Sequence, residues 1–138
     1  MQVTPGWMSS KYSEFNKKYF NGNLPDASRV AFSVNNKKTP MGTAYYTFNT
    51  LTLEVMRYAI AMSNFYDTTE HGKEAVLIHE MCHISHYHNR LMDFLKRDRY
   101  GRYTIDRSFD AHTGFFLDEA ARINSMSDYN VSRYYPSD

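Results

Sequence analysis

The sequence predicts a small α+β domain, on three observations. Apolar residues recur at helical intervals near the beginning, in the middle and near the end of the chain, whereas apolar and polar residues alternate between residues 29 and 55. The length of 138 residues suits one domain, covering residues 1–138. A chain of this length buries about two-thirds of the surface that its unfolded form exposes, which is enough for one hydrophobic core.

Composition excludes several classes of protein. The net charge of +1 does not mark the whole chain as a nucleic-acid binder, and Cys82 is the only cysteine, so no intrachain disulfide can form. No apolar run approaches the length of a membrane span, so we expect no membrane partner. Residues 1–7 lack the basic and apolar regions of a signal peptide. We therefore expect a cytoplasmic protein that is not secreted.

The first part of the chain is predicted to form one helix and three strands. The helix covers residues 8–20, because apolar residues follow one another at intervals of four, three and four: Met8, Tyr12, Phe15 and Tyr19. Ser9 or Ser10 is its candidate cap, and Asn21-Gly22 ends it. The strands are expected at residues 29–34, 43–48 and 51–55. Because their connections are short, we expect a three-stranded antiparallel sheet.

The spacing of apolar residues changes after residue 55. A short helix is predicted at residues 56–64, and a longer helix from Thr68 or Thr69 to about His88. Residues 89–110 are polar and charged, with no predicted element. Asp110 is expected to cap a final helix over residues 111–126, and residues 129–138 form a polar tail that contains tyrosines.

The long middle helix contains His79-Glu80-Met81-Cys82-His83, an H-E-x-x-H motif. Residues four apart share one face of a helix, so His79 and His83 can bind one zinc ion through their imidazole nitrogens. Glu80 then lies beside the metal, where it can accept a proton from a water molecule that the metal activates. The apolar residues before the motif indicate a buried helix, in which two histidines and a glutamate are costly unless they are paired. Cys82 points away from this face and is expected in the core.

A catalytic zinc ion usually has three protein ligands, and the residues alone leave three candidates for the third. His112 ranks first, because it follows a loop that can fold back over the motif helix. Glu119 ranks second. Its position beside Asp118 is typical of a solvated acidic face of a helix, which counts against a role as a metal ligand. His86 ranks third: it shares a face with His79, but three ligands on one straight helix rarely surround a tetrahedral ion.

Several separated motifs resemble those of the SprT-like zinc metallopeptidases, over about residues 12–131. They are, in order, Tyr19-Phe20-Asn21-Gly22-Asn23-Leu24, Met41-Gly42-Thr43-Ala44-Tyr45-Tyr46, Leu77-Ile78-His79-Glu80-Met81-Cys82-His83, His112-Thr113-Gly114-Phe115-Phe116 and Ala121-Arg122-Ile123-Asn124-Ser125-Met126. The resemblance implies a zincin-like domain whose C-terminal helix carries the third zinc ligand, and it selects His112 for that role. Thr113-Gly114 departs from the family's usual Gly-Pro. The single cysteine leaves no zinc ribbon of the kind that many members carry.

The resemblance also implies a function, a zinc-dependent metalloprotease that hydrolyses peptide bonds. His79, His83 and His112 would bind Zn²⁺, and Glu80 would be the catalytic base. The partner would be a protein or peptide substrate that lies extended along an edge strand of the sheet. The family suggests proteins bound or crosslinked to DNA as substrates, which would place the protein at the nucleoid. The candidate donors to the oxyanion are three tyrosines among which the sequence does not choose: Tyr45, Tyr46 and Tyr103.

Two other functions stay open on the sequence. The zinc ion can stabilise a non-proteolytic binding or assembly module, although a structural site has no need of a base such as Glu80. Residues 96–103 mix basic and aromatic side chains, which can contact phosphates and stack on single-stranded bases. A weak DNA contact through this loop is therefore the alternative to an ordinary solvated loop.

Overall fold

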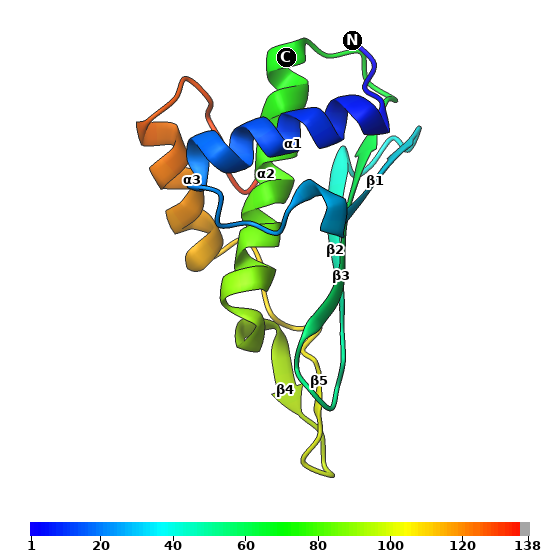
Figure 1. Cartoon of the computed structure of the whole chain (residues 1–138), viewed down its shortest axis with the longest axis vertical. Coiled ribbons are helices and arrows are strands. Elements are labelled where there is room, and N and C mark those ends of the chain that lie inside the picture. Colours follow the sequence, from blue (N-terminus) through cyan, green and yellow to red (C-terminus); the bar gives the residue numbers. More distant parts are fainter. Residues whose placement is uncertain (136–138) are drawn as a thin grey trace.

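The computed structural model describes residues 1–135, and within them three α-helices and two small sheets (Figure 1). The predicted α+β class is confirmed. The helices are α1 (Pro5–Tyr19), α2 (Glu70–Asn89) and α3 (Phe115–Ser125), with 3₁₀ turns at Ala27–Arg29 and Leu91–Phe94. The strands are β1 (Val30–Asn35), β2 (Gly42–Phe48), β3 (Val55–Ser63), β4 (Leu95–Arg97) and β5 (Tyr103–Ile105). Among residues 1–135, no helix combines the length and the apolar character that a membrane crossing requires.

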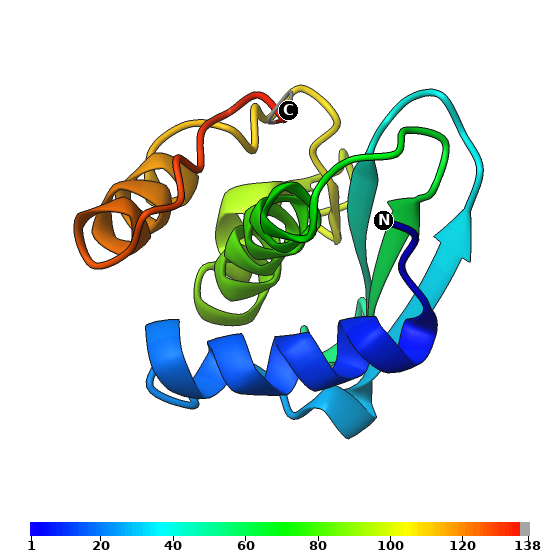
Figure 2. The ribbon, with the colours of Figure 1, turned by 90° about the horizontal axis from the view of Figure 1, so that it is seen from above.

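Helix α2 lies at the centre of the molecule. It contacts β2 and β3 on one side and also packs against α1 and α3, and Figure 2 shows it between the sheet and α3. The helix begins where Thr69 accepts a hydrogen bond from the main-chain nitrogen of Gly72 at 3.0 Å. The predicted start and extent of this helix are therefore confirmed. Because α2 is covered on several sides, residues 75–87 are all buried.

The larger sheet is mixed, and the predicted antiparallel arrangement is wrong. Its order is β1-β3-β2, with β3 parallel to β1 and antiparallel to β2. The second half of β3 is buried almost throughout, at Tyr58, Ile60, Ala61 and Met62, whereas β1 has a single buried residue. A strand that is apolar on both faces belongs in the middle of a covered sheet, so β3 separates β1 from β2. Strand β2 is consequently left at an edge.

The predicted helix at residues 56–64 and the predicted strand at residues 51–55 are also wrong. Residues 55–63 form β3, and the preceding residues turn between β2 and β3, where Leu51 is exposed and Leu53 has a positive φ of 59°. The alanines and methionines of β3 are good helix formers when considered locally. Hydrogen bonds to strands on both sides outweigh that local preference.

Helix α1 begins earlier than predicted. Its cap is Thr4, whose hydroxyl accepts a hydrogen bond from the main-chain nitrogen of Trp7 at 3.1 Å, and Pro5 occupies the first helical position. The four residues that predicted this helix are all buried: Met8, Tyr12, Phe15 and Tyr19. The helix ends as predicted, because Asn21 and Gly22 adopt left-handed backbone conformations.

Helix α3 begins later than predicted, at Phe115, after Gly114 with its positive φ of 52°. Asp110 caps a turn rather than the helix, because its carboxylate accepts a hydrogen bond from the main-chain nitrogen of His112 at 2.9 Å. Between α2 and α3, strands β4 and β5 pair as an antiparallel hairpin that the sequence did not predict. Figure 1 shows this hairpin extending away from the helices.

Candidate metal centre

Three histidine side chains converge beside the middle of α2. His79 and His83 come from the helix, and His112 comes from the turn before α3. The Nε2 atom of His112 lies 3.3 Å from Nε2 of His79 and 3.1 Å from Nε2 of His83. Nitrogen ligands of a tetrahedral ion, bound at about 2.0–2.1 Å, lie about 3.3–3.4 Å from one another. These two separations are close to that value, and the ligand atoms of all three histidines lie within 4.8 Å of one another, so the cluster can hold a single metal ion.

The protonation state of these imidazoles also suits a metal. Burial lowers the pKa of His79 to about 4, with a further lowering from His112 and a smaller opposite effect from the main chain of Ser132. Burial lowers the pKa of His83 to about 2, and the neighbouring histidines add to this effect. The pKa of His112 is also lowered by burial, against the attraction of Asp110. All three side chains are thus neutral near pH 7, which is the form of imidazole that binds metals.

Phe116 forms the floor of the cluster. Its ring centroid lies 4.9 Å from that of His79, 4.5 Å from that of His83 and 5.0 Å from that of His112. Phe116 is itself fully buried on the first turn of α3. A rigid aromatic ring in contact with all three imidazoles restricts their rotation and excludes water from that side.

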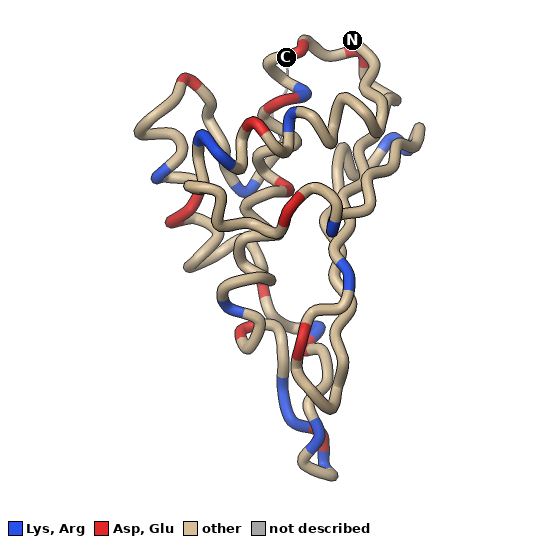
Figure 3. The backbone as a smooth tube through the Cα atoms, in the orientation of Figure 1, with Lys and Arg blue, Asp and Glu red and all other residues tan. Residues whose placement is uncertain are grey.

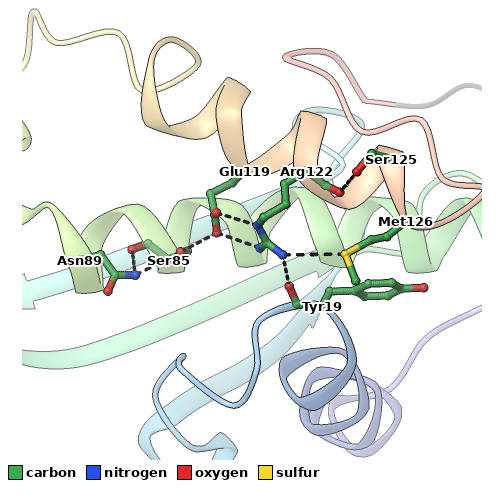
Figure 4. Close-up of polar contacts among 7 residues, drawn as sticks. All are labelled: Tyr19, Ser85, Asn89, Glu119, Arg122, Ser125 and Met126. Carbon is green, nitrogen blue, oxygen red and sulfur yellow. Dashed lines mark hydrogen bonds and ion pairs between the residues drawn. The ribbon is translucent and has the colours of Figure 1, made fainter.

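A polar network joins α3 to the other two helices (Figure 4). The guanidinium of Arg122 donates to both carboxylate oxygens of Glu119, at 3.1 and 3.3 Å, and to the carbonyl of Tyr19 at the end of α1. Glu119 in turn accepts a hydrogen bond from the Ser85 hydroxyl of α2 at 2.9 Å. Arg122 and Glu119 therefore join all three helices at one point.

The other two candidate third ligands do not join the cluster. Glu119 is engaged with Arg122 and Ser85, as described above. His86 is fully buried, but its Nε2 lies 2.8 Å from a carboxylate oxygen of Asp93, and its ring stacks on Phe115. Among the possible metal ligands within residues 1–135, only His112 lies in a group with His79 and His83. The expectation that Cys82 is a core residue is confirmed by its complete burial.

Glu80 is buried beside this cluster. Only 1% of its surface is exposed, and burial raises its pKa to about 8. One of its carboxylate oxygens lies 2.8 Å from the hydroxyl of Tyr135, whose hydrogen bond opposes that rise. The same hydroxyl lies 2.6 Å from the carbonyl oxygen of Gly42, and the Tyr135 ring lies 4.5 Å from the His79 ring. The chain after α3 therefore returns to the motif helix.

Tyr135 belongs to the segment predicted as a polar tail, residues 129–138, of which residues 136–138 lie outside the described part of the chain. The three tyrosines that were proposed as oxyanion donors have other surroundings. Tyr46 packs its ring on Tyr87 and Phe94, the Tyr103 hydroxyl accepts a hydrogen bond from Arg97 at 2.8 Å, and Tyr45 is exposed. No local sequence pattern distinguishes Tyr135 from its neighbours, so nothing in the sequence alone identified it.

Gly42 lies on β2 in close contact with α2. A Cβ atom at this position would lie 2.9 Å from Oε2 of Glu80 and 3.0 Å from a methyl carbon of Val76. We expect Gly42→Ala to lower the free energy of unfolding by about 1–3 kcal/mol, because the extra methyl group must displace one of these side chains. Urea unfolding measures this change.

The matched control for that substitution is Gly6→Ala in α1, where a Cβ atom meets nothing closer than 3.9 Å. Because alanine is favoured over glycine in a helix, we expect this variant to be at least as stable as the parent. A Gly42→Ala variant with the parent's stability would contradict the close packing of β2 against Glu80.

Residues 96–103 form most of the β4–β5 hairpin, where Lys and Arg positions gather at the end of the molecule (Figure 3). The guanidinium of Arg97 lies 4.4 Å from the Tyr103 ring centroid, and that of Arg99 lies 4.8 Å from the Tyr100 ring centroid. Arg102 is paired with Asp98 at 3.1 Å. The hairpin therefore displays stacked arginines and tyrosines, but a nucleic-acid contact here stays a prediction.

Fold and site together define an α+β domain with a cluster of three histidines, two buried and one half-buried, that can hold one metal ion. The sequence matches no protein-family model, and no curated protein matches it.

Proposed function

We propose that this chain is a zinc-dependent peptidase in which Glu80 is the catalytic base. The observation that carries the proposal is the convergence of three neutral imidazoles next to a buried carboxylate that shares helix α2 with two of them. Three imidazole ligands suit zinc, and they leave a fourth position for water or substrate. This arrangement agrees with the zincin-like centre that the resemblance to SprT-like peptidases implies.

The roles of the residues follow from their chemistry. A zinc ion held by His79, His83 and His112 would polarise the scissile carbonyl and lower the pKa of water. Glu80 accepts the proton that water loses as its oxygen attacks the carbonyl carbon. It then transfers this proton to the amine nitrogen as the C–N bond breaks. A nearby cation favours the charged form of Glu80, which offsets the effect of burial on its pKa.

The edge strand β2 is the proposed binding surface for the substrate backbone. It lies at the edge of the sheet, and it begins at Gly42, whose backbone packs against Glu80. An extended peptide can add to such an edge through main-chain hydrogen bonds, which gives little selectivity for sequence. Unfolded protein segments fit this mode. Proteins bound or crosslinked to DNA are proposed on the resemblance alone.

Removal of the metal tests the proposal. Purified protein loaded with zinc is expected to fragment a denatured protein, an excess of chelator is expected to stop the reaction, and one equivalent of zinc is expected to restore it. Metal binding also stabilises the folded state, by about 4 kcal/mol at a free zinc concentration 1,000 times the Kd. Chelation should therefore lower the Tm as well. Fragmentation that continues at the same rate in chelator would contradict the proposal.

A second candidate is a zinc-stabilised binding module without peptidase activity. It is favoured by the position of His79 and His83 in the buried central helix, where a metal stabilises the core whether or not it supports a reaction. The same experiment separates the two functions. A binding module would show the fall in Tm on chelation but would give no fragments under any condition.

A further inference from the structure

The chain beyond α3 is attached to the core at successive points. The side-chain amide of Asn124 donates to the carbonyl oxygen of Val131 and accepts from its main-chain nitrogen, both at 2.8 Å. Val131 is itself buried in the core. Further along, Arg133 lies 3.5 Å from Asp110, the residue that shapes the turn of His112. These contacts direct the segment from residue 126 to residue 135 back towards the histidine cluster.

The segment ends its described path against Glu80. Within residues 1–135, the hydroxyl of Tyr135 supplies the hydrogen bond that holds the Glu80 carboxylate, at 2.8 Å. The aromatic ring contacts His79, and the Tyr135 hydroxyl shares its one proton between Glu80 and the Gly42 carbonyl oxygen, which lies 2.6 Å away at the start of β2. A carboxylate that is buried and held by a single hydroxyl depends on that hydroxyl for its orientation.

We infer that Tyr135 is a positioning residue for Glu80, and that residues 126–135 belong to the site. This inference rests on the proposed function, because it gives Tyr135 the task of orienting a base. Catalytic bases are commonly held by a third group, which fixes their geometry relative to the reacting atoms. Tyr135 can act as this third group, because its ring contacts His79, a proposed metal ligand, and its hydroxyl contacts Glu80, the proposed base.

Tyr135→Phe tests the inference, because it removes the hydroxyl and keeps the ring that packs on His79. In the zinc-loaded protein we expect kcat to fall about 10- to 100-fold, the loss that follows from a small misplacement of a catalytic group. KM is expected to stay within about twofold, because the hydroxyl contacts β2 only at its first residue, Gly42. The matched control is Tyr134→Phe, at a neighbouring tyrosine that is 72% exposed, which should change neither constant.

A second measurement does not depend on activity or on metal. In the metal-free protein, Tyr135→Phe is expected to lower the Tm by about 3–5 °C, the effect of one lost hydrogen bond in a domain of this size. In a Glu80→Ala background the same substitution should lower the Tm by about half as much or less. The difference between the two shifts measures the coupling between Tyr135 and Glu80.

Each outcome decides a separate question. An unchanged kcat for Tyr135→Phe in an active protein overturns the inference. A raised kcat also overturns it, because the segment would then shield the site rather than complete it. If the unsubstituted protein and Glu80→Gln are equally inactive, the proposed function fails, while the two Tm shifts still establish whether Tyr135 holds Glu80. Equal Tm shifts in both backgrounds mean that it does not.

Discussion

Replacing Glu80 with glutamine is expected to lower kcat for peptide hydrolysis by about 10²- to 10⁴-fold, the usual contribution of a general base. Glutamine has nearly the same shape as glutamate, and its amide oxygen can still accept the hydrogen bond from Tyr135. The substitution therefore removes the proton acceptor and leaves the fold and the three histidines in place. Initial rates at saturating substrate, together with the zinc content of both proteins, measure the effect.

Glu119→Gln is the matched control for this substitution. Glu119 also belongs to a helix and is largely covered, but it pairs with Arg122 and Ser85 outside the histidine cluster. We expect it to lose stability, because the charged pair is weakened, and to keep kcat within a few-fold of the parent value. If Glu80→Gln keeps its zinc and cleaves at the parent rate, the peptidase proposal is wrong.

Replacing His112 with alanine is expected to weaken zinc binding by at least about 100-fold. Loss of a residue that merely hydrogen-bonds a metal ligand already costs about 10- to 100-fold in affinity, and His112 is proposed to be a ligand itself. Two ligands from α2 remain, and two imidazoles hold an ion far less tightly than three. The stoichiometry of zinc after dialysis against a competing chelator measures the loss. The Tm of this variant should no longer respond to chelator.

His86 and Glu119, the other two candidate ligands, serve as controls, because their loss is expected to lower stability without lowering the zinc content. His86→Ala removes a fully buried ring that lies 2.8 Å from Asp93, so it should lower the Tm while the zinc stoichiometry stays at that of the parent. Glu119→Ala should behave in the same way, because it breaks the network that joins the three helices. If His112→Ala binds zinc as tightly as the parent, the assigned ligand set is wrong.

The parts of the fold that the sequence predicted correctly are those that local chemistry determines. Helix α2 has a threonine cap at Thr69 and an uninterrupted buried face, so both its start and its character were readable. Strand β1 was found from its alternation of apolar residues. Strand β3 was not found, because its alanines and methionines favour a helix and only pairing with β1 and β2 makes it a strand.

The residues of the site also divide into those that the local sequence predicts and those that only the folded chain brings together. His79 and His83 could be predicted as partners because they stand one turn apart on one helix, and Glu80 because it is next to His79. The contact between His83 and His112 spans 29 residues and a hairpin, so spacing ranked His112 first but did not exclude Glu119 or His86. The meeting of Gly42 and Tyr135 with Glu80 exists only in the folded chain, where strand, helix and C-terminal segment come together.

The hydrogen bond between Tyr135 and Gly42 joins positions 93 residues apart, and this has a consequence for biosynthesis. At a translation rate of roughly 5–20 residues per second, the ribosome adds residue 135 about 5–19 s after residue 42. Strands β2 and β3 and helix α2 are synthesised within that interval, whereas the proposed base gains Tyr135 as its partner only when residue 135 has been added. Until residue 135 has emerged from the ribosome, the nascent chain therefore lacks the hydroxyl that we propose orients Glu80.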